Sequence, residues 1–189
     1  MPVDKQYADF VRSLARSGDG RTFLNSDEDK AVEVLVNLFQ ISTEEVRIFA
    51  GNLCEHVGDK PEYIIALSEF VERGGKLFIL LNNYDKKKAE GSNLFKRLAY
   101  FKSLGKPIFI KSTPAHPYIV SDKDKKEVHF TVGDRKAFRI ETDIVNRTAV
   151  CNFNLPEMAD ETAKFFDSLF KREDATEIDI ENLFEDGDK

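Results

Sequence analysis

Four polar residues on two predicted neighbouring strands form the arrangement best suited to chemistry in this sequence. Arg139 and Glu141 are two residues apart and therefore share one face of a strand, and His129 and Thr131 alternate likewise on the strand before it. A polar pocket at the strand ends could hold an anion through Arg139. The same pattern also fits a surface ladder of cross-strand ion pairs, and the sequence leaves both interpretations open.

Metal and cysteine chemistry have weaker support in the sequence. His116, His129 and Cys151 could converge on a metal ion only if the predicted hairpin packs in that way. Cys54 and His56 are the cysteine and histidine that lie close together in the sequence. Their spacing of two residues does not by itself show that His56 activates Cys54 as a nucleophile. Phosphate-binding loops of the GxGxxG and GxxxxGKS/T types are absent. We therefore expect no metal and no cofactor.

The elements that must position these residues begin with an alternation of strands and helices. Apolar runs of strand length are separated by amphipathic stretches that end at glycines. This order predicts parallel strands with helices packed on the faces of a sheet. The predicted strands are residues 46–51, 76–81 and 107–111, and the predicted helices between them are residues 62–73 and 94–104.

The pattern changes after residue 112. Residues 127–132 and 136–141 alternate in polarity around a Gly-Asp-Arg turn, which is typical of a β-hairpin, and residues 147–153 form one more strand. Pro156 opens a final helix. With further helices predicted at residues 4–16 and after Asn25, the chain is expected to be an α/β protein with a mixed, mainly parallel sheet of six or seven strands.

Charge is distributed unevenly along the chain. Residues 86–139 contain fourteen basic and five acidic side chains, a net charge of +9, whereas residues 173–189 contain eight acidic and one basic, a net charge of −7. The basic middle, with its interspersed aromatic residues, is a candidate nucleic-acid-binding surface. The acidic end is expected to be a flexible tail, a strand added to a sheet edge, or a docking segment for a protein partner.

Composition excludes several classes of protein. The 189 residues contain no apolar run long enough to span a membrane, and residues 1–7 do not resemble a signal peptide, so we expect a cytoplasmic location without membrane attachment. Two cysteines are too few for a disulfide scaffold. We expect one domain over residues 1–172, of which residues 1–24 are an N-terminal helical extension, followed by the tail at 173–189.

Three segments give the chain a resemblance to a known family. They are Val46-Arg-Ile-Phe-Ala-Gly-Asn-Leu53, the stretch from Leu67 through the Arg73-Gly-Gly-Lys76 turn to Leu81, and the hairpin from Val128 to Glu141. Their order resembles a single repeat of the phospholipase D superfamily over residues 25–170. The resemblance implies an α/β fold and a phosphodiester-processing site formed where two copies meet, so a homodimer is expected.

The family's chemistry rests on a His-x-Lys-x4-Asp motif, followed by an asparagine on the next strand. Here His129 has Thr131 at the lysine position and Asp134 two residues early. Asn152 or Asn154 would supply the phosphate-holding amide. By this resemblance His129 is the candidate nucleophile and Asp134 orients it.

A second alignment of the motif starts at His116. It places Tyr118 at the lysine position and Asp122 one residue early, so both alignments lack the lysine. We expect a degenerate, non-catalytic binding module that recognises nucleic acid or a protein partner through Arg139, Glu141 and His116. The alternatives are a dimeric, metal-independent nuclease or phosphodiesterase, and a structural subunit that docks through its tail.

Overall fold

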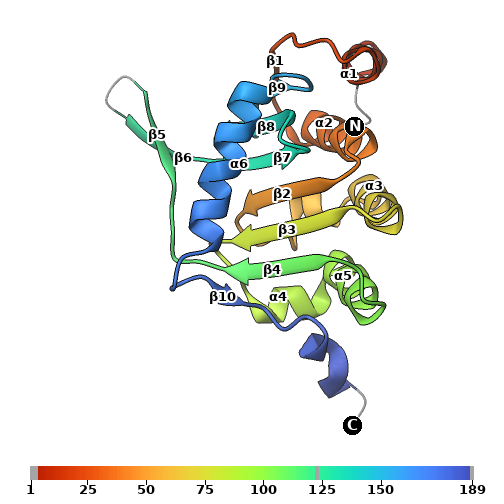
Figure 1. The fold of residues 1–189 in the computed structure, drawn as a ribbon, viewed down its shortest axis with the longest axis vertical. Helices are drawn as coiled ribbons and strands as arrows, with labels where there is room; N and C mark the ends of the chain where they lie inside the picture. Colours follow the sequence, from red (N-terminus) through yellow and green to blue (C-terminus); the bar gives the residue numbers. More distant parts are fainter. Residues whose placement is uncertain (1–3, 122–123, 188–189) are drawn as a thin grey trace.

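The computed structural model describes residues 4–121 and 124–187 and has an eight-stranded mixed sheet at its centre (Figure 1). The strand order is β1-β9-β8-β7-β2-β3-β4-β10. Parallel pairing joins β2, β3 and β4, and the other neighbours pair antiparallel. The strands of this sheet are β1 (Phe23–Asn25), β2 (Glu45–Ala50), β3 (Lys76–Leu81), β4 (Ile108–Ser112), β7 (His129–Gly133), β8 (Ala137–Asp143), β9 (Thr148–Asn152) and β10 (Thr176–Glu177).

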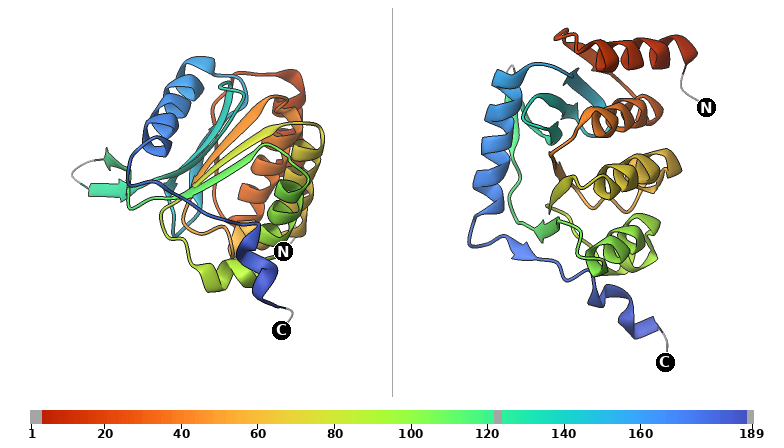
Figure 2. Two further views of the ribbon diagram at one scale, coloured as in Figure 1. Left: turned by 60° about the horizontal axis from the view of Figure 1, so that its bottom comes forward. Right: turned by 45° about the vertical axis from the view of Figure 1, so that its right-hand side comes forward.

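Helices cover both faces of the sheet, which confirms the predicted α/β class. In the two views of Figure 2, α2, α3 and α5 lie on one face and α6 lies alone on the other. Pro61 and Pro156 begin α3 and α6, because a proline lacks only an N–H that the first helical turn leaves unpaired. The helices are α1 (Lys5–Ser17), α2 (Glu28–Ile41), α3 (Pro61–Glu72), α4 (Lys86–Gly91), α5 (Asn93–Ser103) and α6 (Pro156–Phe170), with short 3-10 helices η1 (His56–Asp59) and η2 (Asn182–Gly187).

The buried strands explain how the sheet holds its helices. Ile48, Leu77 and Ile79 are at most 2% exposed and pack under α2, α3 and α5, while Phe49 and Leu80 are equally buried under α6. Strands whose side chains are buried on both faces have continuous apolar sequences, and this is the pattern that predicted them. The polar residues of these strands therefore lie at the amino and carboxyl ends of the strands.

The N-terminal region joins the sheet instead of extending away from it. After α1, residues Phe23–Asn25 form β1 and pair with Ala149–Cys151 of β9, a strand that the sequence analysis did not predict. Three residues are too few to show alternation. This pairing brings Asn25 beside the polar residues of β8.

A second hairpin projects from the side to which the carboxyl ends of β2, β3 and β4 point (Figure 1). Strands β5 (Tyr118–Ser121) and β6 (Asp124–Glu127) pair antiparallel, and both precede β7. The sequence analysis predicted no strand between residues 111 and 127, and Asp and Lys side chains, which are rare in strands, dominate residues 121–126. Asp122, the acid of the second motif alignment, lies outside the described residues.

Residues 173–187 of the acidic C-terminal segment differ from the expected flexible tail and agree with the alternative of a strand added to a sheet edge. Strand β10 pairs with β4, and the Ile178 N–H donates to the Ile110 carbonyl over 3.0 Å. Ile180 and Leu183 are 3% and 6% exposed and belong to the main core. These apolar side chains anchor the segment although most of its other residues are charged. No helix in the described part of the chain has the length and apolar character to cross a membrane.

Candidate ligand-binding site

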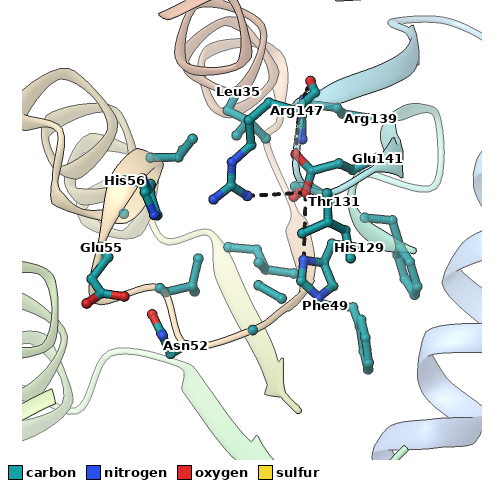
Figure 3. A pocket seen from close by; sticks show the side chains of 18 of the residues that line it. Leu35, Phe49, Asn52, Glu55, His56, His129, Thr131, Arg139, Glu141 and Arg147 are labelled. Atoms are coloured by element: carbon teal, nitrogen blue, oxygen red, sulfur yellow. Dashed lines mark hydrogen bonds and ion pairs between the residues drawn. The ribbon is translucent and has the colours of Figure 1, made fainter. Parts of the chain in front are cut away.

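A cavity of about 250 Å³ lies at the carboxyl end of β2, between that strand and helices α2, α3 and η1 (Figure 3). His129, Thr131, Arg139 and Glu141 all line it, together with Arg147 from the turn between β8 and β9. The carboxyl ends of parallel strands commonly carry the ligand sites of α/β proteins. The polar cluster predicted on the hairpin therefore borders a cavity.

Glu141 is the centre of this cluster. Its carboxylate accepts from Arg139 over 3.1 Å and from Arg147 over 3.5 Å, and it lies 3.7 Å from Nδ1 of His129. Burial raises the pKa of Glu141, but His129 and the two arginines outweigh it and hold that pKa below the ordinary value. Glu141 is thus a buried anion whose charge is shared among three neighbours.

His129 lies between two carboxylates. Its Nδ1 faces Glu141, and its Nε2 is buried, has no hydrogen bond and lies 3.7 Å from Oε1 of Glu127 on β6. Glu127 is itself held by the Asn82 side-chain amide over 2.6 Å and by His116 Nδ1 over 3.1 Å. The two histidines that the motif alignments treated as alternatives therefore converge on Glu127. The sequence analysis did not single out this carboxylate.

Arg139 stands opposite Thr131, the residue at the lysine position of the family motif. Its guanidinium donates to Asn25 Oδ1 over 3.0 Å and to the Arg147 carbonyl over 3.2 Å in addition to Glu141. Arg139 is 6% exposed, so its guanidinium interacts with groups of the protein and not with solvent. The predicted anion-binding arginine is in this way a structural link between β1 and β8.

Asp134 does not orient His129. The two residues lie at opposite ends of β7, which places them about 17 Å apart along a strand. The Asp134 carboxylate instead accepts from the backbone N–H groups of Thr43, Glu44 and Glu45 over 2.7 to 3.0 Å. Its turn position, with φ of 49°, directs the side chain toward the start of β2. Asp134 therefore fixes the turn and takes no part in the cavity.

Asn152 and Asn154 also lie away from the cavity. Asn152 pairs with Phe138 at the far end of β8, and its amide donates to the Gly20 carbonyl over 2.8 Å and to the Thr22 hydroxyl over 3.0 Å. Asn154 donates to the Gly18 carbonyl over 2.7 Å. Both amides hold the loop between α1 and β1 onto β9, so neither is placed to bind a phosphate beside His129.

Left-handed backbone conformations gather around the cavity. Leu53, His56 and Arg147 line it and have φ between 56° and 57°, a region that side-chain-bearing residues rarely adopt. The loop is also tight at Gly58, where a Cβ atom would lie 2.0 Å from the Leu53 carbonyl oxygen. Such conformations occur where surrounding structure enforces them, often at ligand sites. Single-sequence patterns carry no signal for a left-handed Leu or Arg.

The basic side chains of residues 86–139 do not all face solvent as free charges. Arg135 pairs with Glu45, Asp160 and Asp167, Arg139 is buried, and Lys88 pairs with Glu55. Exposed basic residues remain on α4, on α5, on the projecting hairpin and in the turn between β7 and β8. They are Lys86, Lys87, Lys96, Arg97, Lys125, Lys126 and Lys136, and Lys125 lies over the Tyr118 ring at 4.5 Å.

Neither metal binding nor cysteine chemistry gains support from the geometry. The described residues contain no group of three His, Cys, Asp or Glu side chains arranged to hold a metal ion. Cys54 and Cys151 are free and buried. Burial raises the pKa of the Cys54 thiol to about 11 and that of Cys151 to about 12, which opposes thiolate formation.

The fold defines the class of protein. It is the phospholipase D-like fold, as the comparison with solved structures shows. The phospholipase D family member Nuc from Salmonella typhimurium matches with a TM-score of 0.54 and 12% identity, over 84% of this chain and 99% of that one. NucT from Helicobacter pylori matches with a TM-score of 0.55, 12% identity and the same coverage of 84% and 99%.

A third similar structure is TrmBL2, an archaeal chromatin protein described as showing a novel mode of DNA binding. It matches with a TM-score of 0.58 and 13% identity, over 92% of this chain and 62% of that one. No protein-family model matches the sequence, and no curated protein matches it. At these identities the likeness establishes the fold, and the site must be argued from its own residues.

Proposed function

We propose that this chain is a nucleic-acid-binding module on a phospholipase D-like fold that does not cleave the phosphodiester backbone. The observation that carries the proposal is the pair of carboxylates beside His129. Glu127 and Glu141 each lie 3.7 Å from one of its ring nitrogens. A phosphate that approached Nε2 of the histidine would meet the Glu127 carboxylate instead of the cations that phosphoryl transfer needs, because the two arginines of the cluster are bonded to Glu141.

The cations of the cluster do not offset this repulsion. Arg139 is buried and bonded to Glu141, and Thr131 takes the position of the family's lysine. Asp134, the acid that the motif assigns to orient the histidine, lies at the other end of β7, and Glu141, which faces Nδ1 of His129, is shared with two arginines. The residues that would stabilise a pentavalent phosphorus are therefore missing from the position that the fold provides for them.

Nucleic acid is the favoured ligand on two grounds. The similar structure of TrmBL2 is that of a chromatin protein that binds DNA, which shows that this fold is compatible with such a partner. In addition, the hairpin beside the carboxyl edge exposes Lys125 and Lys126 together with Tyr118, a combination suited to phosphates and unpaired bases.

Binding and cleavage can be tested in one experiment on the full chain. Fluorescence anisotropy with labelled single- and double-stranded DNA and RNA is measured at low and physiological salt, and the same samples are run on a denaturing gel. We expect salt-sensitive binding, intact substrates, and unchanged binding in His129→Ala. The proposal fails if no nucleic acid binds at low salt.

A dimeric phosphodiesterase is the second candidate, favoured by the buried and unpartnered Nε2 of His129. That atom would be available as a nucleophile if a second copy displaced Glu127. In that case the gel would show cleavage, the activity would disappear in His129→Ala, and sedimentation would show a dimer. Cleavage that survives in His129→Ala would indicate a contaminating nuclease and support neither function.

A further inference from the structure

We propose that the cavity at the end of β2 binds the terminal phosphate of a nucleic-acid strand between Arg147 and His56. This inference rests on the proposed function and names the part of the ligand that enters the molecule. It places binding on two residues outside the family motif, on the opposite side of Glu141 from the His129–Glu127 contact.

An arginine and a histidine face the cavity, and the outer side of each already contacts a carboxylate. Figure 3 shows Arg147 reaching into the cavity from the turn between β8 and β9, with His56 on the opposite wall. Glu141 accepts from one nitrogen of Arg147 over 3.5 Å, and Glu28 lies 3.0 Å from Nδ1 of His56. The remaining nitrogens of the guanidinium and the Nε2 of His56 have no polar partner among the described residues. An anion between them would supply one.

Carboxylates in the cavity wall do not prevent an anion from entering. Glu55 is paired with Lys88 over 2.8 Å, and Glu141 is shared by Arg139, Arg147 and His129. Each carboxylate that lines the cavity is therefore already matched by a cation. Leu35, Val57 and Ile144 contribute apolar surface to the same cavity, and charged hydrogen bonds are stronger in less polar surroundings.

The backbone supports these two side chains in strained positions. The described chain has six residues other than glycine with positive φ, and three of them, Leu53, His56 and Arg147, line this cavity. The other three serve as a helix cap or form the turn between β7 and β8. Strain that concentrates around one cavity, at both Arg147 and His56, indicates a ligand clamp.

The size and lining of the cavity favour a strand end over an internal phosphate. A volume of about 250 Å³ bounded by α2, α3 and η1 admits one terminal nucleotide and excludes a continuous duplex. Leu35, Val57 and Ile144 line it and offer contacts for a sugar and base. A phosphomonoester also carries close to two negative charges near neutral pH, about one more than an internal phosphodiester, and so gains more from the Arg147 guanidinium.

The test uses the full chain and a labelled oligothymidylate in four forms: with a 5′-phosphate, with a 3′-phosphate, with hydroxyl ends only, and circularised. We expect one phosphorylated end to bind about tenfold more tightly than the hydroxyl form. Arg147→Gln and His56→Gln should each abolish that preference. Lys76→Gln removes one positive charge at the amino end of β3, at the opposite end of the strands from the cavity, and should retain the preference.

The outcomes separate this inference from the proposed function. Equal binding of all four forms, unaffected by Arg147→Gln, would overturn the clamp and leave nucleic-acid binding intact. Absence of binding by any form would overturn both. Thymidine monophosphate should compete with the phosphorylated end, and inorganic phosphate should compete more weakly because it lacks the nucleoside. Thermal melting of each variant ensures that a lost preference reflects a folded protein, and His56→Gln is an independent check if Arg147→Gln melts early.

Discussion

Two networks of arginines and carboxylates lie at opposite ends of the same strands, and only one of them adjoins a cavity. At the amino end of β2, Arg47 pairs with Glu45 at 2.6 Å and with Asp167 of α6 at 2.7 Å. Arg135 at the turn between β7 and β8 pairs with the same two carboxylates. At the carboxyl end, Glu141 contacts Arg139, Arg147 and His129.

The two networks differ in the part of the molecule that each one contacts. The amino-end network joins the sheet to α6, and each of its arginines faces at least two carboxylates. Each network contains one buried nitrogen without a hydrogen bond, Nη1 of Arg47 at the amino end and Nε2 of His129 at the carboxyl end. At the carboxyl end, in addition, an arginine extends into a cavity. Similar residue types therefore join a helix to the sheet at one end and border a cavity at the other.

Removing Asp167 should give the largest effect on stability. Asp167→Ala leaves Arg47, which is 5% exposed, without its link to α6. Breaking one side of a buried pair costs about 3 kcal/mol when the remaining charge stays desolvated, and we expect the loss to approach this value because Arg47 keeps Glu45 alone and Arg135 loses the same carboxylate. Urea unfolding at neutral pH would measure this loss, and nucleic-acid binding by the folded fraction should be unchanged.

Asp160→Ala is the matched control for that prediction. Asp160 contacts Arg135 at 2.9 Å, but it is more exposed and Arg135 keeps Asp167 and Glu45. An exposed pair contributes about 0 to 1 kcal/mol. If both variants lost the same small amount, the amino-end network would be a surface feature and the contrast between the two ends would weaken.

Replacing Glu141 should give an intermediate and pH-dependent effect. Glu141→Gln weakens charged hydrogen bonds worth about 2 kcal/mol at pH 7. The folded-state pKa of Glu141 lies below its ordinary value of 4.5, so the carboxylate contributes stability above that value and loses it as pH falls through the folded pKa. Wild type and variant should therefore converge in urea unfolding below pH 4.5. A difference that stays constant down to pH 2 would show that charge is not its origin.

The sequence predicted the framework better than the site, for a physical reason. Strands such as β2 and β3 are buried on both faces, so their apolar runs identify them without knowledge of their neighbours. The pairing of Arg139 with Glu141 was also predictable, because two residues along a strand share a face. The contributions of Asn25 and Glu127 to the site were not predictable. Asn25 lies on β1, far away in the sequence, and Glu127 lies on β6, whose polar sequence does not indicate a strand.

The predicted catalytic set shows the limit of spacing as a guide. Asp134 follows His129 by nearly the expected interval, yet a left-handed turn directs it toward Thr43 and Glu45. Asn152 has the expected residue type on the expected strand, but lies at the end of β9 that holds the N-terminal loop. Spacing fixes which strand carries a residue. The direction of the turn and the end of the strand decide which cavity it can reach.

The smallest effect on stability should come from Glu127, and it should be accompanied by a gain in binding. Its side chain is 38% exposed, so Glu127→Gln should change the free energy of unfolding by less than about 1 kcal/mol. The amide keeps the shape of the side chain and can still accept from Asn82. Removing this negative charge beside His129 should tighten nucleic-acid binding by up to about tenfold at low salt, and less at high salt.

His116→Ala is the control, because it removes a neighbour of Glu127 and leaves the carboxylate in place. That variant should not tighten binding. If Glu127→Gln bound no more tightly than wild type, phosphates would not approach His129, and the repulsion invoked against cleavage would not operate there. If Glu127→Gln instead cleaved its substrate, and Glu127→Gln with His129→Ala did not, this one carboxylate would separate a binding module from an enzyme on the same fold.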